Sequence, residues 1–146
     1  MHTVSSMMTA VPLTVPDDAK LTDAARVMRD HAIGAVMVVR DGQLHGIVTD
    51  RDIVVRALAA GSDPTAMPVS EVCTPGPVTV QPGDDVETVI ALMRDRAVRR
   101  VPVVQHGKPA GMVSLGDLAV KRGDMPALAD ICAVPPDFPR AWEDDR

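Results

Sequence analysis

The sequence predicts a mixed α/β (α+β) protein in which two β-α-β-β-α repeats pack as a pseudo-two-fold pair. When the chain is shifted by 65 residues without a gap, residues 4–53 match residues 69–118 at 17 of 50 positions, which indicates an internal repeat. Each copy alternates short β-branched runs with segments of helical periodicity. One such unit alone would expose the apolar face of its small sheet, so we expect the copies to cover each other.

The first half of each copy is predicted to be a short extended segment followed by a helix. Residues 13–15 and 78–80 lead into acidic residues, which are favoured at helix starts. Apolar side chains then recur at i, i+3, i+4 and i+7, the spacing of one buried stripe on a helix. The stripe residues are Leu21, Ala24, Ala25 and Met28 in the first copy, and Val86, Val89, Ile90 and Met93 in the second.

The second half of each copy is predicted to be a hairpin and a further helix. Residues 36–39 and 101–104 are apolar and β-branched, which favours strands. Gly42 and Gly107 follow them, where a tight turn needs a residue that tolerates positive φ, and a returning strand comes next. The apolar side of the last helix is expected to carry Ile53, Val54, Ala57 and Leu58 in the first copy, and Leu118, Ala119 and Val120 in the second.

These elements assign the first repeat to residues 4–62 and the second to residues 69–122, with a short linker up to residue 68. Residues 133–146 contain several prolines and an acidic run. A segment of that composition does not bury enough apolar surface to order itself, so we expect a flexible C-terminal tail.

Composition limits the classes of partner. The formal net charge of -5 gives no general attraction to nucleic-acid phosphates, and one Phe and one Trp offer no base-stacking platform. No apolar run approaches the roughly 20 residues of a membrane helix, and residues 1–10 do not resemble a signal peptide. Cys73 and Cys132 are far apart, without metal-type spacing, which suits a reducing compartment. We therefore expect a cytoplasmic protein that binds neither nucleic acid nor membranes.

One motif occurs in both copies and can carry ligand chemistry. Residues 46–52 and 111–117 both fit glycine, two apolar residues, a hydroxyl residue, two variable residues and an aspartate. The hydroxyl residue, Thr49 or Ser114, ends a strand, and the aspartate lies in the first turn of the next helix, beside free backbone N–H groups. The hydroxyl can bond a phosphate oxygen, whereas the carboxylate suits vicinal hydroxyls such as those of ribose.

The same residues also fit a purely structural interpretation. Thr49 and Ser114 can be helix N-caps, with Asp52 and Asp117 at the N3 position of a capping box. Recurrence at the 65-residue spacing does not decide between the two, because a duplicated cap would recur too. Both interpretations stay open on the sequence alone.

Together with the strand sequence 100–104, Arg-Val-Pro-Val-Val, the two motif copies resemble a tandem pair of CBS domains, the module named after cystathionine β-synthase. The resemblance covers about residues 4–122. Within the family, residues 49–54 and 59–64 resemble short actinobacterial proteins that consist of this pair alone, including those of the hypoxic response type. The resemblance implies two clefts between the repeats that accept AMP, ADP, ATP or S-adenosylmethionine, no required cofactor, and a homodimer in which two pairs stack into a disc.

Ligand-binding positions follow from the resemblance. The two aspartates would hold the ribose hydroxyls, the threonine and serine would approach the phosphate, two apolar residues would flank the adenine, and three arginines could supply charge for the phosphate. For the arginines, ordinary surface charge is the alternative. The copies differ at the arginine positions, so we expect two non-equivalent clefts. The nine candidates are Asp52, Thr49, Asp117, Ser114, Ile33, Val98, Arg51, Arg99 and Arg100.

The function that these expectations favour is a non-catalytic sensor that binds an adenosine ligand and regulates a partner that the sequence does not indicate. One rival is a ligand-free interaction protein that acts through its dimer surface. Another is an enzyme, but the sequence shows no P-loop or Ser-His-Asp pattern. The histidines lack the spacing of metal ligands and are His2, His31, His45 and His106.

Overall fold

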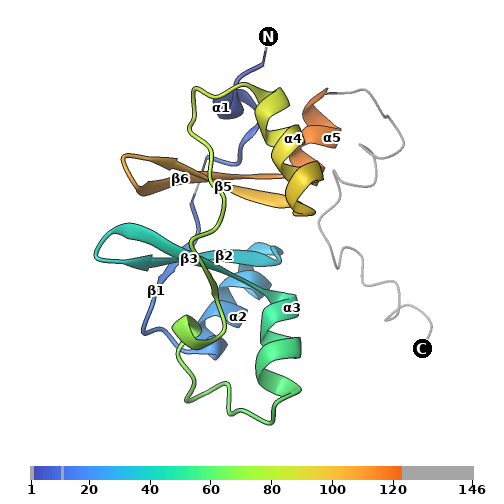
Figure 1. Ribbon diagram of the computed structural model, residues 1–146. Helices are drawn as coiled ribbons and strands as arrows, with labels where there is room; N and C mark the ends of the chain where they lie inside the picture. The colour runs from blue at the N-terminus through green and yellow to red at the C-terminus, as the bar shows by residue number, and fades with distance from the viewer. Residues whose placement is uncertain (1, 11, 123–146) are drawn as a thin grey trace, which may run out of the picture.

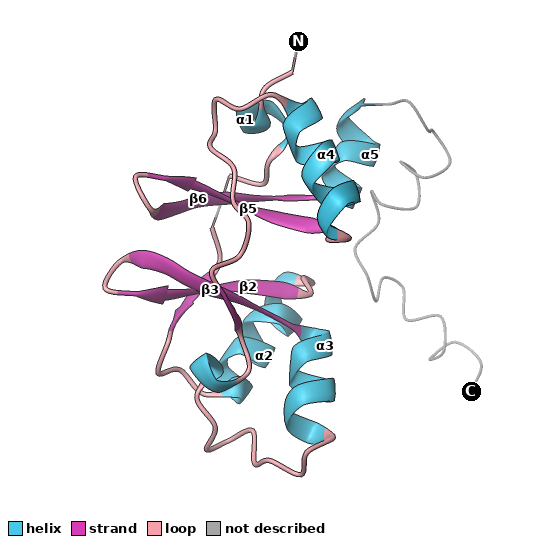
Figure 2. Cartoon of the chain, in the orientation of Figure 1, coloured by secondary structure: helices cyan, strands magenta, loops and turns pink. Residues whose placement is uncertain are grey.

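A computed structural model describes residues 2–10 and 12–122. Two small sheets face each other at the centre of the molecule, and the helices cover their outer faces (Figures 1 and 2). The expected mixed α/β class and the paired arrangement of the repeats are both confirmed. The stretch 133–146, expected to be a flexible tail, lies outside the described residues.

The first repeat forms a helix-backed sheet in which β1 runs parallel to β2, and β2 and β3 form an antiparallel hairpin. After β3 the chain turns directly into a short α-helix that continues as a π-helical stretch. The bounds are β1 Thr14–Pro16, α2 Leu21–His31, β2 Ala35–Arg40, β3 Gln43–Thr49, α3 Asp50–Asp52 and η1 Ile53–Leu58.

The second repeat follows the same plan. Its hairpin pairs β5 with β6, and Val80 bridges to Val103 in parallel, as β1 does to β2. The helix α1 stands at the start of the chain, and the short η2 and β4 stand at the matching place of the second repeat. The bounds are α1 Val4–Met7, η2 Val69–Glu71, β4 Thr74–Pro75, α4 Val86–Arg96, β5 Arg100–Gln105, β6 Lys108–Ser114 and α5 Leu115–Arg122.

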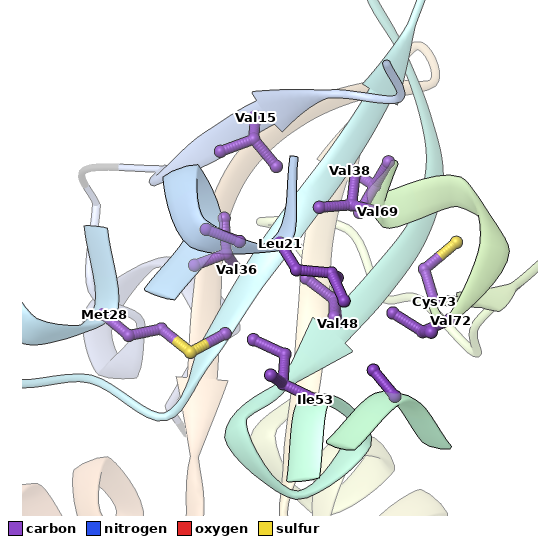
Figure 3. Packing of buried hydrophobic residues seen from close by; sticks show 12 residues of the cluster. Val15, Leu21, Met28, Val36, Val38, Val48, Ile53, Val69, Val72 and Cys73 are labelled. Atoms are coloured by element: carbon purple, nitrogen blue, oxygen red, sulfur yellow. The ribbon is translucent and has the colours of Figure 1, made fainter. Parts of the chain in front are cut away.

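The opening segments of the repeats are exchanged. Val4 and Met7 are buried in the core of the second repeat, whereas Val69, Val72 and Cys73 are buried in that of the first. Figure 3 shows the latter three among side chains of the first repeat. Each packed core therefore takes residues from both repeats as the sequence divides them, and the division at 4–62 and 69–122 stays a prediction.

The exchange is made in the same way on both sides. The N–H of Val69 donates to the carbonyl of Ala19 at 2.8 Å, and the N–H of Val4 donates to that of Asp84, also at 2.8 Å. Further along, β4 pairs with β3, and Thr9 bridges to Met112 on β6 in the corresponding register. Because the donors and acceptors lie at equivalent positions in the two repeats, the two exchanged segments are related by the pseudo-two-fold symmetry.

A glycine allows the close approach of each exchanged segment. A β-carbon on Gly46 would lie 2.7 Å from the carbonyl oxygen of Thr74, and one on Gly111 would lie 2.5 Å from that of Thr9. Real β-carbons essentially never come within 3.0 Å of another heavy atom. The first residue of the motif is thus explained by packing against backbone.

Several expected helix faces are placed differently. On α2 the stripe is confirmed at Leu21, Ala24 and Met28, but Ala25 is exposed and Val27 packs against the core instead. On η1 the predicted burial of Val54 and Leu58 is wrong, since these side chains are 56% and 58% exposed. Ile53 and Ala57, which are four residues apart, share the core side of the helix, and Val54 and Leu58 each lie one position further round and face outward.

On α5, Leu118 is buried as expected, whereas Val120 is exposed and its predicted burial is wrong. Residues two apart on an α-helix point to nearly opposite sides, so they do not share a core face. The apolar residues that follow each hairpin thus divide between core and surface.

We expect Gly46→Ala to lower the free energy of unfolding by about 1–3 kcal/mol, because the added methyl group would overpack against the backbone of the exchanged segment. Gly83→Ala is the matched control, since nothing lies within 4 Å of a β-carbon there. It should be neutral or stabilising by up to about 1 kcal/mol. Urea denaturation measures both, and equal effects would contradict the packing explanation.

Candidate functional site

The duplicated motif forms a capping box in each repeat. Thr49 Oγ1 accepts from the N–H of Asp52 at 3.1 Å, and Asp52 Oδ2 accepts from the N–H of Thr49 at 2.9 Å. Ser114 and Asp117 make the same two hydrogen bonds, at 3.1 and 2.9 Å. The structural interpretation is therefore confirmed in both copies, and it locks one carboxylate oxygen of each aspartate.

The second oxygen of each aspartate has a longer contact. Asp52 Oδ1 lies 3.5 Å from Arg56 Nε, and Asp117 Oδ1 accepts from the hydroxyl of Thr9 at 3.4 Å. The side chain of Asp52 is 14% exposed. Contacts of this length are weak, so each carboxylate keeps the capacity to accept a hydrogen bond from another donor.

Basic residues four positions after each aspartate hold the exchanged segments. Arg56 Nη1 donates to the carbonyl of Val72 at 3.1 Å. Lys121 Nζ donates to the carbonyls of Met7 and Met8 at 2.9 and 3.2 Å. Sequence reasoning missed these two residues, although a basic side chain at the same place in both repeats was a usable signal. They connect the helix of each motif to a segment of the other repeat.

The two apolar candidates share a backbone setting. Ile33 and Val98 follow Ala32 and Ala97, which end α2 and α4 in the left-handed conformation with φ of 53°. Each is partly buried against the core of its own repeat. Only Val98 lines the pocket of about 290 Å³ in the second repeat. The pocket residues are Ile90, Met93, Arg94, Val98, Arg99, Leu115 and Leu118.

Two of the arginine candidates have different surroundings. Arg51 is exposed on α3, and its backbone N–H donates to Asp50 Oδ1 at 2.8 Å. Arg99 lines the pocket of the second repeat, and Arg51 is not among the residues that line it.

The third arginine, Arg100, reaches from the second repeat into the first. Its backbone opens β5 opposite Ser114. A β-carbon on Gly34 would nevertheless lie 2.7 Å from Arg100 Nη2 and 3.1 Å from Asp50 Oδ2. The guanidinium thus stands beside the first motif while its main chain belongs to the second.

The thiol of Cys73 lies in the exchanged segment and is buried. Burial raises its pKa above the usual value, because the thiolate would lose its hydration. The thiolate is the reactive form of cysteine, so the closed structure disfavours reaction at this residue.

Over the part of the chain that the structure describes, no three His, Cys, Asp or Glu side chains are grouped so that they could hold a metal ion. In the same residues, none of the helices combines the length and the apolar character needed to cross a membrane.

Comparison with known families gives two matches to the CBS domain, over residues 4–58 and 69–122. The chain belongs to the CBS domain family. CBS domain-containing protein YhcV of Bacillus subtilis is 39% identical over 84% of this chain and 86% of its own. Hypoxic response protein 1 of Mycobacterium tuberculosis is 37% identical over 82% of this chain and 84% of its own, so the expected likeness to that type is confirmed.

Solved structures share the fold. The crystal structure of Hypoxic Response Protein I, with two coordinated zinc ions, has a TM-score of 0.74 at 36% identity, over 81% of this chain and 97% of that one. The CBS pair of protein MJ0100, in complex with 5′-methylthioadenosine and S-adenosyl-L-methionine, has a TM-score of 0.75 at 26% identity. The match covers 84% of this chain and 96% of that one. The CBS domain protein PAE2072 from Pyrobaculum aerophilum, complexed with AMP, has a TM-score of 0.76 at 26% identity. The match covers 88% of this chain and 99% of that one. CBS pairs related to this chain therefore bind adenosine compounds.

We expect Arg56→Met, in a Cys132→Ser background, to speed the labelling of Cys73 by a thiol reagent about tenfold or more. The variant keeps the alkyl stem but loses the donors that hold the exchanged segment, and a hydrogen bond from a charged group contributes about 1.5–3 kcal/mol.

Arg26→Met is the control for this experiment, because its ion pair with Asp23 is exposed and far from the segment in sequence. Labelling is followed by absorbance at constant pH. Equal rates in the two variants would show that Arg56 does not hold the segment.

Proposed function

We propose that this CBS pair is a non-catalytic regulatory module that binds an adenosine-containing ligand at its motif sites. The observation that carries the proposal is that Thr49 with Asp52, and Ser114 with Asp117, repeat one geometry in both repeats. The adenosine complexes of MJ0100 and PAE2072 support this ligand class. AMP, ADP, ATP and S-adenosylmethionine all fall within it, and none is a required cofactor.

The capping box supports ribose binding rather than competing with it. Because a backbone N–H fixes Oδ2, the carboxylate of Asp52 or Asp117 is oriented before any ligand arrives. Preorganised groups lose less entropy on binding, and a carboxylate oxygen accepts readily from vicinal hydroxyls. The weak contacts of Oδ1 are then the ones that a ribose would replace.

We propose that the other candidates contact the ligand around the carboxylates of Asp52 and Asp117. Ile33 and Val98 would flank the adenine, while Thr49 and Ser114 would approach a phosphate. Arg51, Arg99 and Arg100 would supply positive charge. None of these three arginines forms an ion pair with another described residue, which leaves their charge available to a ligand.

A second function, that of a ligand-free interaction protein, is favoured by a specific observation. The capping boxes explain both copies of the motif without any ligand. In addition, apolar side chains are exposed on η1 and α5, and both helices lie on the right-hand side of Figure 2. These side chains are Val54, Val55, Leu58, Leu115 and Val120.

In both alternatives we propose that this apolar surface on η1 and α5 pairs two copies of the chain into a homodimer. Exposed apolar side chains on a protein surface commonly mark an interface. We propose further that the regulated partner is another protein and that the module acts in the cytoplasm.

Ligand binding is tested by isothermal titration of AMP, ADP, ATP and S-adenosylmethionine into the whole chain and into Asp52→Asn and Asp117→Asn. We expect saturable binding that one or both substitutions weaken about tenfold or more, because asparagine still caps the helix but lacks the charge. Asp23→Asn is the matched control, since Asp23 accepts from the Lys20 N–H in the same way on α2.

Absence of heat with every ligand would reject the sensor and favour the interaction protein. Steady nucleotide hydrolysis that is lost in Asp52→Asn would contradict the non-catalytic assignment instead.

The dimer is tested by sedimentation of a Leu58→Glu, Leu115→Glu double variant. Two charges buried in an apolar interface are strongly unfavourable, so we expect a monomer with unchanged circular dichroism. Lys108→Glu, on the exposed hairpin of the second repeat, should leave the mass unchanged. A wild-type chain that sediments as a monomer would contradict the proposal.

A further inference from the structure

The pocket of the second repeat combines apolar side chains with two arginines. It has a volume of about 290 Å³, and five of its seven lining residues are apolar. The other two, Arg94 and Arg99, are exposed. Arg94 contacts Asp95 at 3.3 Å, but these side chains are 73% and 65% exposed, and an exposed ion pair is weak. A partner that fits this pocket therefore presents an apolar group next to negative charge.

The matching surface of the first repeat is less apolar and less basic. The shift of 65 residues relates each pocket residue to a counterpart, and three of the seven differ in chemical class or markedly in size. In the second repeat these residues are Ile90, Arg99 and Leu115, and in the first they are Ala25, Gly34 and Asp50. A negatively charged partner is therefore better matched to the second repeat.

The chain itself contains such a group after the last described residue. Residues 123–146 carry both aromatic residues of the chain, Phe138 and Trp142. They also carry six carboxylate side chains and two arginines, and thus four of the five net negative charges. Trp142 is followed directly by the acidic residues 143–145, so a large apolar side chain and a concentrated negative charge occur together.

The length of this segment is sufficient for it to reach the pocket. Leu115 and Leu118 of the pocket lie on α5, which ends at Arg122, where the described chain also ends. A helix of this length, 8 residues, is about 12 Å long, whereas residues 123–141 span up to about 60 Å when extended. Because the segment is tethered to one side of the pocket, its effective concentration there is millimolar, and weak contacts are enough.

We propose that the C-terminal segment docks on the pocket of the second repeat, with the indole of Trp142 among the apolar side chains and the carboxylates of residues 143–145 beside Arg94 and Arg99. An indole buries a large area and is an effective anchor. The inference does not depend on the proposed function, since no ligand takes part in it. Val98 and Arg99 are also proposed ligand contacts, so the docked segment would compete with a ligand at the second repeat.

The test is acrylamide quenching of tryptophan fluorescence in the whole chain without ligand. Trp142 is the one tryptophan of the chain, so the signal reports on this residue alone. We expect Arg94→Glu with Arg99→Glu to raise the quenching constant about twofold or more, because the reversed charges repel the acidic residues. Arg26→Glu with Arg29→Glu is the matched control, since it makes the same change of net charge at exposed arginines of the first repeat. The control should leave the quenching unchanged.

A charge exchange separates docking from loss of folding. Glu143→Lys with Asp144→Lys should also expose Trp142 to the quencher. When these two substitutions are combined with Arg94→Glu and Arg99→Glu, opposite charges face each other again, and the protection of the tryptophan should return to near its wild-type value. An unfolded variant would not be rescued in this way.

Three outcomes would overturn the proposal. If Trp142 is quenched equally in the wild type and in the variant with Arg94→Glu and Arg99→Glu, or if the combined variant does not regain protection, the segment does not dock on this pocket. Leu115 also belongs to the apolar surface on η1 and α5, so a second copy of the chain would then be the occupant. Protection that rises with protein concentration would show docking on another copy and would reject docking within one chain.

Discussion

The exchange of opening segments between the repeats is the constraint on which the rest of the molecule depends. Each core is complete only when residues from the other repeat enter it, and a glycine at the start of each motif lets the foreign backbone come close. Arg56 and Lys121 then hold the entering segments from the helices that the motifs begin. The motif is therefore at once a strand end, a helix cap and the place where two repeats are joined.

This arrangement explains how a structural motif can also be a binding motif. The capping box fixes the aspartate with one oxygen, and the other oxygen stays in weak contact with Arg56 or Thr9, close to the exchanged segment. A ligand at that oxygen would act on groups that connect the repeats. Regulation by such a module requires only that the ligand prefer one arrangement of these groups over another.

Sequence reasoning predicted the repeat and the β-α-β-β-α order within each copy, and it offered the capping boxes as one of two interpretations, because these depend on local patterns. It did not predict the exchange, since Val4 and Val69 are the same residue at the same place in each copy and fit either core. It did not predict the exposure of Val54 and Leu58, because these residues have the same i, i+4 spacing as Ile53 and Ala57 and only packing selects the pair that is buried. The reach of Arg100 to Gly34 depends on how the repeats face each other, and only the folded pair defines that.

The exchange also orders events during synthesis. When the first repeat leaves the ribosome, residues 69–73, which complete its core, have not yet been made. Residues 4–8 have no sheet to pack against until β6, which ends at Ser114, has also emerged. Met7 and Met8 thus stay without their partners until nearly the whole described chain has emerged, and contacts so distant in sequence form slowly. A nascent chain stalled midway would expose the apolar side chains of residues 4–8, to which a chaperone could bind.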